Sequence, residues 1–215
     1  MGRELRYEIN LTTRIIHWVL FTSITVNVFT GFYIHTPFIA GGPGGFLMAW
    51  MRFFHFVASY ALVLALIVKV YLAFNSRFDK TWKDYGIIKN LKDLPDILGY
   101  YLFLKSTHKD YRKYNPLQAF AYLSIALLLI FSALTGAAIY KGRLFGIINS
   151  AEGFRWVSTM LGGESYTRIW HYLSMWGFII FAGVHIYMVV LHTLVNRDKT
   201  LTSMFSGYRL RKKTS

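Results

Sequence analysis

The sequence predicts an all-α membrane protein, a bundle of four transmembrane helices with one further helix at the cytoplasmic membrane surface. Two observations support this fold class: 54% of the 215 residues are hydrophobic, with a mean hydropathy of +0.36, and the apolar residues gather into four long runs. Each run reaches the roughly 20 residues needed to cross a bilayer. We therefore expect one membrane domain over residues 1–215, with spans at about residues 15–35, 53–74, 117–140 and 168–195.

Cysteine content and charge narrow the function classes. The chain has no cysteine, which excludes disulfides, cysteine-ligated iron–sulfur clusters and the covalent attachment of c-type haem. The net charge of +14 could suggest nucleic acid, but the basic residues lie in the loops between the predicted spans. Anionic membrane lipid and the positive-inside rule explain that distribution better. We expect contact with lipid and none with nucleic acid.

The first two predicted spans each carry a histidine near their start, His17 and His55. Thr30-Gly31 lies near the end of the first span, and Lys69 lies near the end of the second. Small residues such as Thr30 and Gly31 let helices or a flat cofactor approach closely. Histidine inside a membrane is costly unless something binds it, so both are candidate ligands.

The polar segment of residues 75–115 contains a helical stripe. Its apolar members recur at alternating steps of four and three, with lysines and aspartates between them: Ile87, Leu91, Leu94, Leu98 and Tyr101. This spacing predicts an amphipathic helix on the membrane surface, bent or divided at Pro95. A solvated loop helix that packs on a soluble partner is the alternative.

The third and fourth spans differ in what they carry. The third has no histidine but repeats the earlier pair as Thr135-Gly136. The fourth has His171, His185 and His192. The 14-residue step from His171 to His185 is close to four helical turns, which places both on one face about 21 Å apart. One helix therefore offers two ligands at two depths.

The lysines and arginines predict the orientation. Eighteen lie in the N-terminal segment, in residues 75–115 and in the C-terminal tail, and five lie in the other loops. The positive-inside rule then places both termini and residues 75–115 in the cytoplasm, in a multi-pass protein of the inner membrane. His55 and His171 share the outer level, and His17 and His185 share the inner level. By depth alone, His192 matches His17 at least as well as His185 does.

Paired histidines at two levels favour two non-covalent b haems. Two imidazoles on opposite faces of a haem give closed, six-coordinate iron, which suits electron transfer. Zinc or copper would need three or four ligands at one level, and carboxylate chemistry would need acidic residues, which the four spans lack. A transporter or a structural anchor with incidental, satisfied core histidines is the alternative from another class.

Each of three histidines follows an arginine in the pattern R-x-x-H. The arginines are Arg14, Arg52 and Arg168. If each opens a helix, it opposes the macrodipole and needs a favourable partner. Haem propionates are such partners, and Lys69 is a fourth candidate. The alternative for each is a side chain that reaches lipid phosphate.

Asn115 and Gln118, at the cytoplasmic start of the third span, bring amide donors that suit a quinone carbonyl. The alternative is that Asn115 only caps this helix.

Several motifs together resemble a known family. They are RIIHW, RFFHF, YNPLQ, RIWHYLSMW, GVHIYM and the tail TLTSMFSGY. The chain resembles the di-haem cytochrome b subunit of membrane-bound nickel–iron uptake hydrogenases, in a wider family that includes the gamma subunit of respiratory formate dehydrogenase. The similarity runs from the first span to the tail. A glycine of the formate dehydrogenase quinone motif is replaced here by Leu117.

The resemblance implies haem ligation by His17, His55, His171 and His185, and so decides against His192. It also implies electron transfer from an iron–sulfur small subunit, itself joined to a nickel–iron large subunit, to menaquinone or ubiquinone near the inner face. An equivalent subunit of a formate dehydrogenase or a thiosulfate reductase is the alternative within the family.

Overall fold

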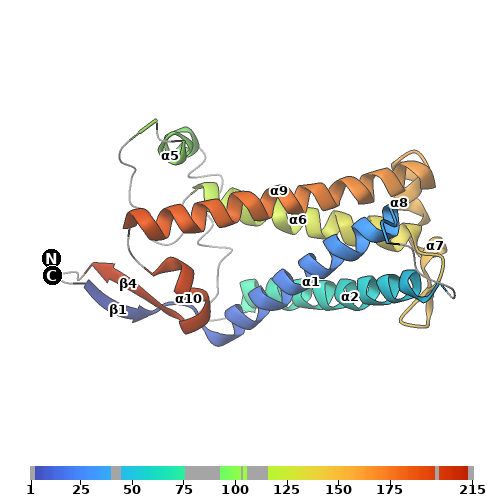
Figure 1. Ribbon diagram of the computed structural model, residues 1–215, viewed down its shortest axis with the longest axis horizontal. Helices are drawn as coiled ribbons and strands as arrows, with labels where there is room; N and C mark the ends of the chain where they lie inside the picture. The colour runs from blue at the N-terminus through green and yellow to red at the C-terminus, as the bar shows by residue number, and fades with distance from the viewer. Residues whose placement is uncertain are drawn as a thin grey trace. The chain divides into compact units, whose positions relative to one another are not determined.

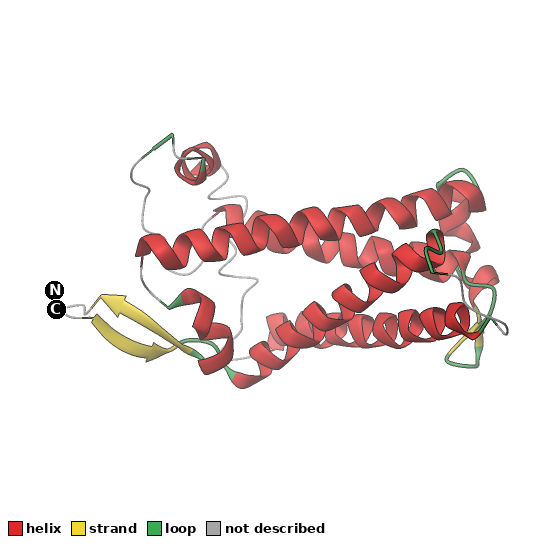
Figure 2. Ribbon diagram, in the orientation of Figure 1, coloured by secondary structure: helices red, strands yellow, loops and turns green. Residues whose placement is uncertain are grey.

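The structure is a computed structural model that describes residues 3–39, 45–75, 93–102, 104–105, 116–196 and 199–212. It is mainly helical, with two small pairs of strands (Figures 1 and 2). Four helices are long and apolar enough to cross a membrane, and they confirm the four predicted spans. These helices are α1 (Leu11–His35), α2 (Phe46–Asn75), α6 (Pro116–Ile139) and α9 (Glu164–Asn196). The chain is therefore a multi-pass membrane protein.

Short elements connect or follow the long helices. They are α5 (Leu94–Tyr101), β2 (Arg143–Leu144), β3 (Ile148–Asn149), α7 (Ser150–Gly153), α8 (Arg155–Met160) and α10 (Thr200–Ser206). Three members of the predicted surface stripe fall in α5, while Ile87 and Leu91 lie outside the described residues. Pro95 stands in the first turn of α5, where its missing N–H costs nothing, and so it bends no helix there. The position of α5 on the membrane surface stays a prediction.

The chain divides into two compact units. Unit 1 comprises Met1–Trp18, Ile67–Ser124 and Ala182–Ser215, and unit 2 comprises Val19–Leu66 and Ile125–Phe181. Each long helix contributes residues to both. The expectation of a single domain over residues 1–215 stays a prediction.

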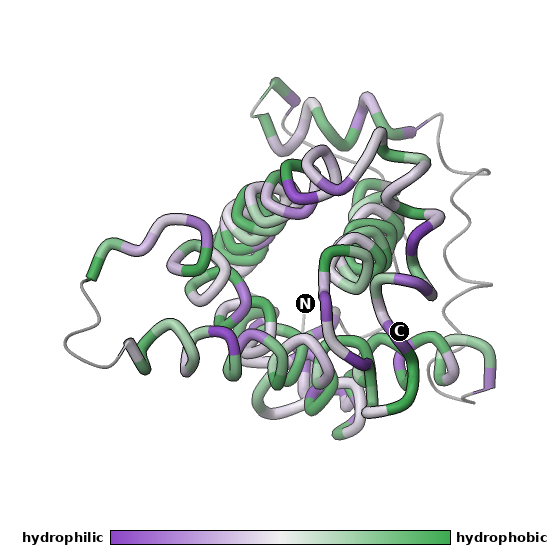
Figure 3. The backbone as a smooth tube through the Cα atoms, turned by 90° about the vertical axis from the view of Figure 1, so that its right-hand side faces the viewer, coloured by the Kyte–Doolittle hydropathy of each residue, from purple (hydrophilic) through white to green (hydrophobic). Residues whose placement is uncertain are grey.

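Unit 2 is a four-helix bundle. Its buried centre is formed by Leu62, Leu129 and Phe178, with Leu20 and Ile24 of α1 packed against them, so all four long helices meet in one cluster. The helices are mostly hydrophobic along their length (Figure 3). Since lipid is as apolar as these side chains, close van der Waals packing and interhelical hydrogen bonds must hold the bundle together.

Unit 1 brings the two ends of the chain together. Strand β1 (Arg3–Tyr7) pairs antiparallel with β4 (Tyr208–Lys212), and the Arg211 side chain binds the Glu8 carboxylate through both oxygens at 2.6 and 3.0 Å. Gly207 before β4 has φ +84°, and a Cβ there would lie 2.6 Å from the Tyr7 ring. Only glycine fits this turn without strain. The pairing of β1 with β4 therefore brings the two ends of the chain together.

Candidate functional site

Each unit holds one pair of facing histidines. In unit 2, the ring centres of His55 (α2) and His171 (α9) are 6.3 Å apart, with an angle of 73° between the ring planes. In unit 1, the ring centres of His17 (α1) and His185 (α9) are also 6.3 Å apart, at 46°. The structure therefore brings together the four histidines in the two combinations that depth and resemblance predict.

The shared separation fits a metal ion between two imidazoles. A first-row metal binds an imidazole nitrogen at about 2.0–2.1 Å, and that nitrogen lies roughly 1.1 Å from its ring centre, so two rings on opposite sides of one ion have centres about 6.3 Å apart. Within the described ranges, the potential ligands occur as pairs and not as groups of three or more. Both pairs therefore fit axial ligation of a haem iron, which takes its other four bonds from the macrocycle.

In unit 2, Thr30 of α1 holds the ring of His55. The Thr30 Oγ1 atom lies 2.9 Å from His55 Nδ1 and donates its proton to the Val26 carbonyl at 2.7 Å. With the single hydroxyl proton on the Val26 carbonyl, the Thr30 oxygen is an acceptor for an Nδ1–H group of His55. This arrangement suits the tautomer in which Nε2 is the nitrogen available to a metal.

The second ring of unit 2 is held in the same way by α6. Thr135 Oγ1 lies 3.0 Å from His171 Nδ1 and donates to the Phe131 carbonyl at 2.8 Å. The same arrangement suits the tautomer of His171 that carries its proton on Nδ1 and leaves Nε2 for a metal.

The glycine after each threonine makes room for the same ring. A Cβ on Gly31 would lie 3.3 Å from His55 Cε1, and a Cβ on Gly136 would lie 3.0 Å from His171 Cε1. The space that small residues leave here is occupied by the imidazole. At both places, the threonine contacts a histidine ring and the glycine leaves the space that this ring occupies.

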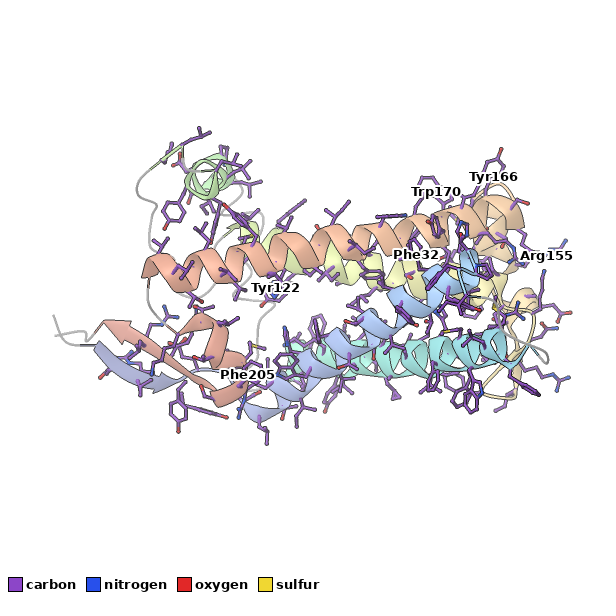
Figure 4. The ribbon with its side chains drawn as sticks, viewed as in Figure 1. Phe32, Tyr122, Arg155, Tyr166, Trp170 and Phe205 are labelled. Carbon is purple, nitrogen blue, oxygen red and sulfur yellow. The ribbon has the colours of Figure 1, made fainter. Side chains whose placement is uncertain are left out.

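The pair of histidines in unit 1 has a different support. The His17 Nδ1 atom is buried and has no hydrogen-bond partner among the described residues. Its neighbour Trp18 donates from Nε1 to the Met204 carbonyl at 3.1 Å and packs its ring 4.7 Å from that of Phe205. Phe205 is labelled on α10 in Figure 4. The C-terminal segment thus braces the helix turn that presents His17.

The predicted propionate partners are differently placed. The helices begin at Leu11, Phe46 and Glu164, so the expectation that each of the three arginines opens its helix was wrong. Arg14 donates to the Phe205 carbonyl, and its buried Nε has no partner among the described residues. Arg52 is exposed.

Glu164, in the first turn of α9, binds two cations. Its carboxylate accepts from Arg168 Nη2 at 2.7 Å and also pairs with Lys141. Arg168 therefore already has an anionic partner within the chain, which sequence reasoning missed because Glu164 precedes the predicted span.

The remaining candidates lie in unit 1 or outside the described residues. Lys69 is near enough to His17 to act on it electrostatically. His192 Nδ1 lies 3.2 Å from Thr200 Oγ1, so one nitrogen of this third histidine is engaged by α10. Gln118 is half-buried in the first turn of α6, and Asn115 lies outside the described residues.

The chain is similar to several known proteins along most of its length. The family model described as prokaryotic cytochrome b561 matches residues 8–207. A probable Ni/Fe-hydrogenase B-type cytochrome subunit of Cupriavidus necator is 32% identical over 97% of this chain and 89% of its own length. Its counterpart in Azotobacter vinelandii is 31% identical over 95% of this chain and 88% of its own length. In Escherichia coli K12, a probable Ni/Fe-hydrogenase 1 B-type cytochrome subunit is 26% identical over 96% of this chain and 91% of its own length.

Proposed function

Because the chain belongs to the prokaryotic cytochrome b561 family, we propose that it is the membrane anchor and electron-transfer subunit of a hydrogen:quinone oxidoreductase. It would pass electrons from a periplasmic nickel–iron hydrogenase through two b haems to quinone. The observation that supports this most strongly is the pair of histidine pairs, each with ring centres 6.3 Å apart.

The residues of each unit would hold one haem. His55 and His171 would ligate the outer haem, and His17 and His185 the inner haem. Haem b, when bound, supplies one-electron redox chemistry. With two histidines holding each haem, no position on the iron would stay open to another ligand, which would favour electron transfer over oxygen chemistry. Arg14 and Lys69 are the best-placed partners for the propionates of the inner haem.

The names of the relatives favour a hydrogenase as the partner, over a formate dehydrogenase or a thiosulfate reductase. We propose that the iron–sulfur small subunit, joined to the nickel–iron large subunit, docks on the loop between α6 and α9 and on the first turns of α9. Arg155, Tyr166 and Trp170 are exposed there (Figure 4). Aromatic and arginine side chains are the residues most enriched at protein interfaces.

The paired termini support the proposed topology, with both ends in the cytoplasm and the chain in the inner membrane. Quinone, either menaquinone or ubiquinone, would then bind near the inner haem in unit 1. Gln118 remains a candidate donor to its carbonyl, and Asn115 is a second.

A spectroscopic experiment tests this function. We expect a reduced-minus-oxidised difference spectrum of the purified protein to show a b-type signal with two haems per chain. In membranes that contain the hydrogenase, hydrogen should reduce both haems and added quinone should reoxidise them. Gln118→Ala should slow reoxidation while haem content and reduction by hydrogen stay normal. A colourless protein would refute the proposal, and normal reoxidation of this variant would move the quinone site elsewhere.

A further inference from the structure

We propose that Thr30 and Thr135 are positioning residues that hold His55 and His171 as Nδ1–H donors and thereby lower the reduction potential of the outer haem. This inference rests on the proposed function, because it concerns ligands of a haem that the function requires. It adds to that function a means by which the chain itself makes the two haems unequal.

The hydroxyl oxygen of each threonine is placed to accept a hydrogen bond from the histidine beside it. Thr30 is 3% exposed and Thr135 is 0% exposed, so water does not compete for either hydroxyl. Each hydroxyl proton is committed to a carbonyl one turn back in its own helix. The oxygen can then only accept, and the histidine nitrogen beside it is the donor it faces.

A similar set of hydrogen bonds surrounds each of the two histidines. One turn beyond His55, Ser59 Oγ lies 2.7 Å from the His55 carbonyl and 3.1 Å from Asn27 Oδ1, three residues before Thr30. Next to His171, Ser174 Oγ lies 2.6 Å from the His171 carbonyl and 3.2 Å from the hydroxyl of Ser132, which is three residues before the second threonine.

Each arrangement therefore joins a polar residue three positions before a threonine, the glycine after that threonine, a histidine, and a serine that bonds the histidine carbonyl from three or four residues further on. Together they fix both the ring and the helix turn that carries it. A buried polar network formed once can serve packing alone. Its repetition around both facing rings, from different helices, indicates that it serves the rings.

The electronic consequence follows from the direction of the hydrogen bond. An acceptor at Nδ1–H makes the imidazole a more basic ligand. A more basic ligand stabilises the oxidised iron more than the reduced iron, so the reduction potential falls. Both outer ligands have such an acceptor, whereas His17 Nδ1 has none among the described residues. The outer haem would then have two ligands made more basic in this way and the inner haem at most one, which favours electron transfer from the outer haem to the inner haem.

Substitution of the hydroxyl alone tests the proposal. Thr30→Val and Thr135→Val keep the side-chain shape and remove the hydroxyl acceptor, while the backbone hydrogen bonds of the two rings to Asn27 and Ser132 remain. Each should raise the reduction equilibrium constant of the outer haem by about tenfold, which is about 59 mV for a one-electron couple. Haem affinity should also fall, by roughly 10–100-fold. Thr30→Ser and Thr135→Ser keep the hydroxyl and should restore both values. A redox titration of the purified two-haem protein, followed optically, measures them.

Thr25 provides the matched control. It lies on the same helix as Thr30, and its hydroxyl also bonds the carbonyl one turn back, Phe21, at 2.9 Å, but it faces outward. Thr25→Val should therefore leave both potentials unchanged.

Three results would overturn the proposal: an unmoved outer potential in the valine variants, an equal shift of both haems, or an equal shift in the Thr25 variant. If a valine variant loses the outer haem, its potential cannot be measured, and the serine variant at the same position becomes the test. Loss of the outer haem in the serine variant as well would overturn the proposal, because serine keeps the hydroxyl. Failure of the proposed function is distinct, since it would appear as wild-type protein without two b haems.

Discussion

The two histidine pairs, which the proposed topology places at the outer and inner levels, have the same ring separation but different supports. His55 and His171 are held by buried threonine hydroxyls of neighbouring helices within unit 2. His17 is held through its neighbour Trp18, whose indole bonds a carbonyl of the C-terminal segment. The outer pair thus depends on interactions inside a bundle, while the inner pair depends on a part of the chain that lies almost 190 residues away.

This difference predicts different sensitivity to change. A ring fixed by a hydrogen bond inside a packed bundle can move little, because protein interiors tolerate even small changes of volume poorly. A ring braced through a terminal segment can follow the movements of that segment. We therefore expect changes near the outer pair to act strongly on one haem, and changes in the tail to act weakly on the other.

Removal of the ligands is the largest change that can test this comparison. His171→Ala and His55→Ala should each abolish binding of the outer haem and leave the inner haem in place. Each variant would leave only one histidine to hold the outer haem. His17→Ala and His185→Ala should do the reverse. Haem content per chain and the reduced-minus-oxidised spectrum measure the loss.

His192→Ala is the matched control for this series, since it removes a histidine of α9 seven residues beyond His185. Both haems should be retained. If the inner haem is lost in this variant and kept in His185→Ala, the assignment of the inner ligand is wrong.

A methyl group added at Gly31 or Gly136 should have the next largest effect. Alanine suits a helix better than glycine by roughly 1 kcal/mol, so Gly→Ala is stabilising where there is space. At Gly136 the new Cβ would lie 3.0 Å from His171, and at Gly31 it would lie 3.3 Å from His55. Gly136→Ala should therefore weaken retention of the outer haem more than Gly31→Ala does.

Gly183→Ala is the control, because a Cβ there meets nothing within 4 Å among the described residues. Outer haem content should be unchanged in this variant. Equal losses of the outer haem in all three variants would show that the ring contacts do not govern its retention.

The sequence was sufficient to predict the four spans, because apolar run length is a local property. It was not sufficient to predict the role of the Thr-Gly pairs. Their repetition was visible, but only the fold shows that Thr30 and Gly31 meet a ring 25 residues away. The pairing of β1 with β4 joins the two ends of the chain, and no local pattern indicates so distant a partner.

The tail contact should have a smaller effect, confined to the inner haem. Trp18→Phe keeps an aromatic ring against Phe205 and removes the indole hydrogen bond to Met204, which contributes about 0.5–1.5 kcal/mol. The inner haem should bind slightly less tightly and show a broadened signal in electron paramagnetic resonance. Trp170→Phe, in unit 2, is the control and should leave the inner haem unchanged. A shift of the signal of the outer haem in Trp18→Phe would contradict the prediction that the two histidine pairs are supported separately.

The smallest effect is expected at Arg168, and it separates the arginines that the R-x-x-H pattern treats alike. The Arg168 guanidinium is exposed and already pairs with Glu164, whereas the Arg14 guanidinium bonds the Phe205 carbonyl and keeps a buried Nε without a partner among the described residues. An exposed ion pair contributes little, because water screens it. Arg168→Gln should therefore leave the outer haem potential nearly unchanged. Arg14→Gln should lower the inner potential, since removal of a cation from beside an anionic propionate disfavours the added electron. Redox titration of both variants measures the two shifts. A large shift in Arg168→Gln with none in Arg14→Gln would reverse the assignment, and would mean that Glu164 leaves Arg168 free to bind a propionate once haem is present.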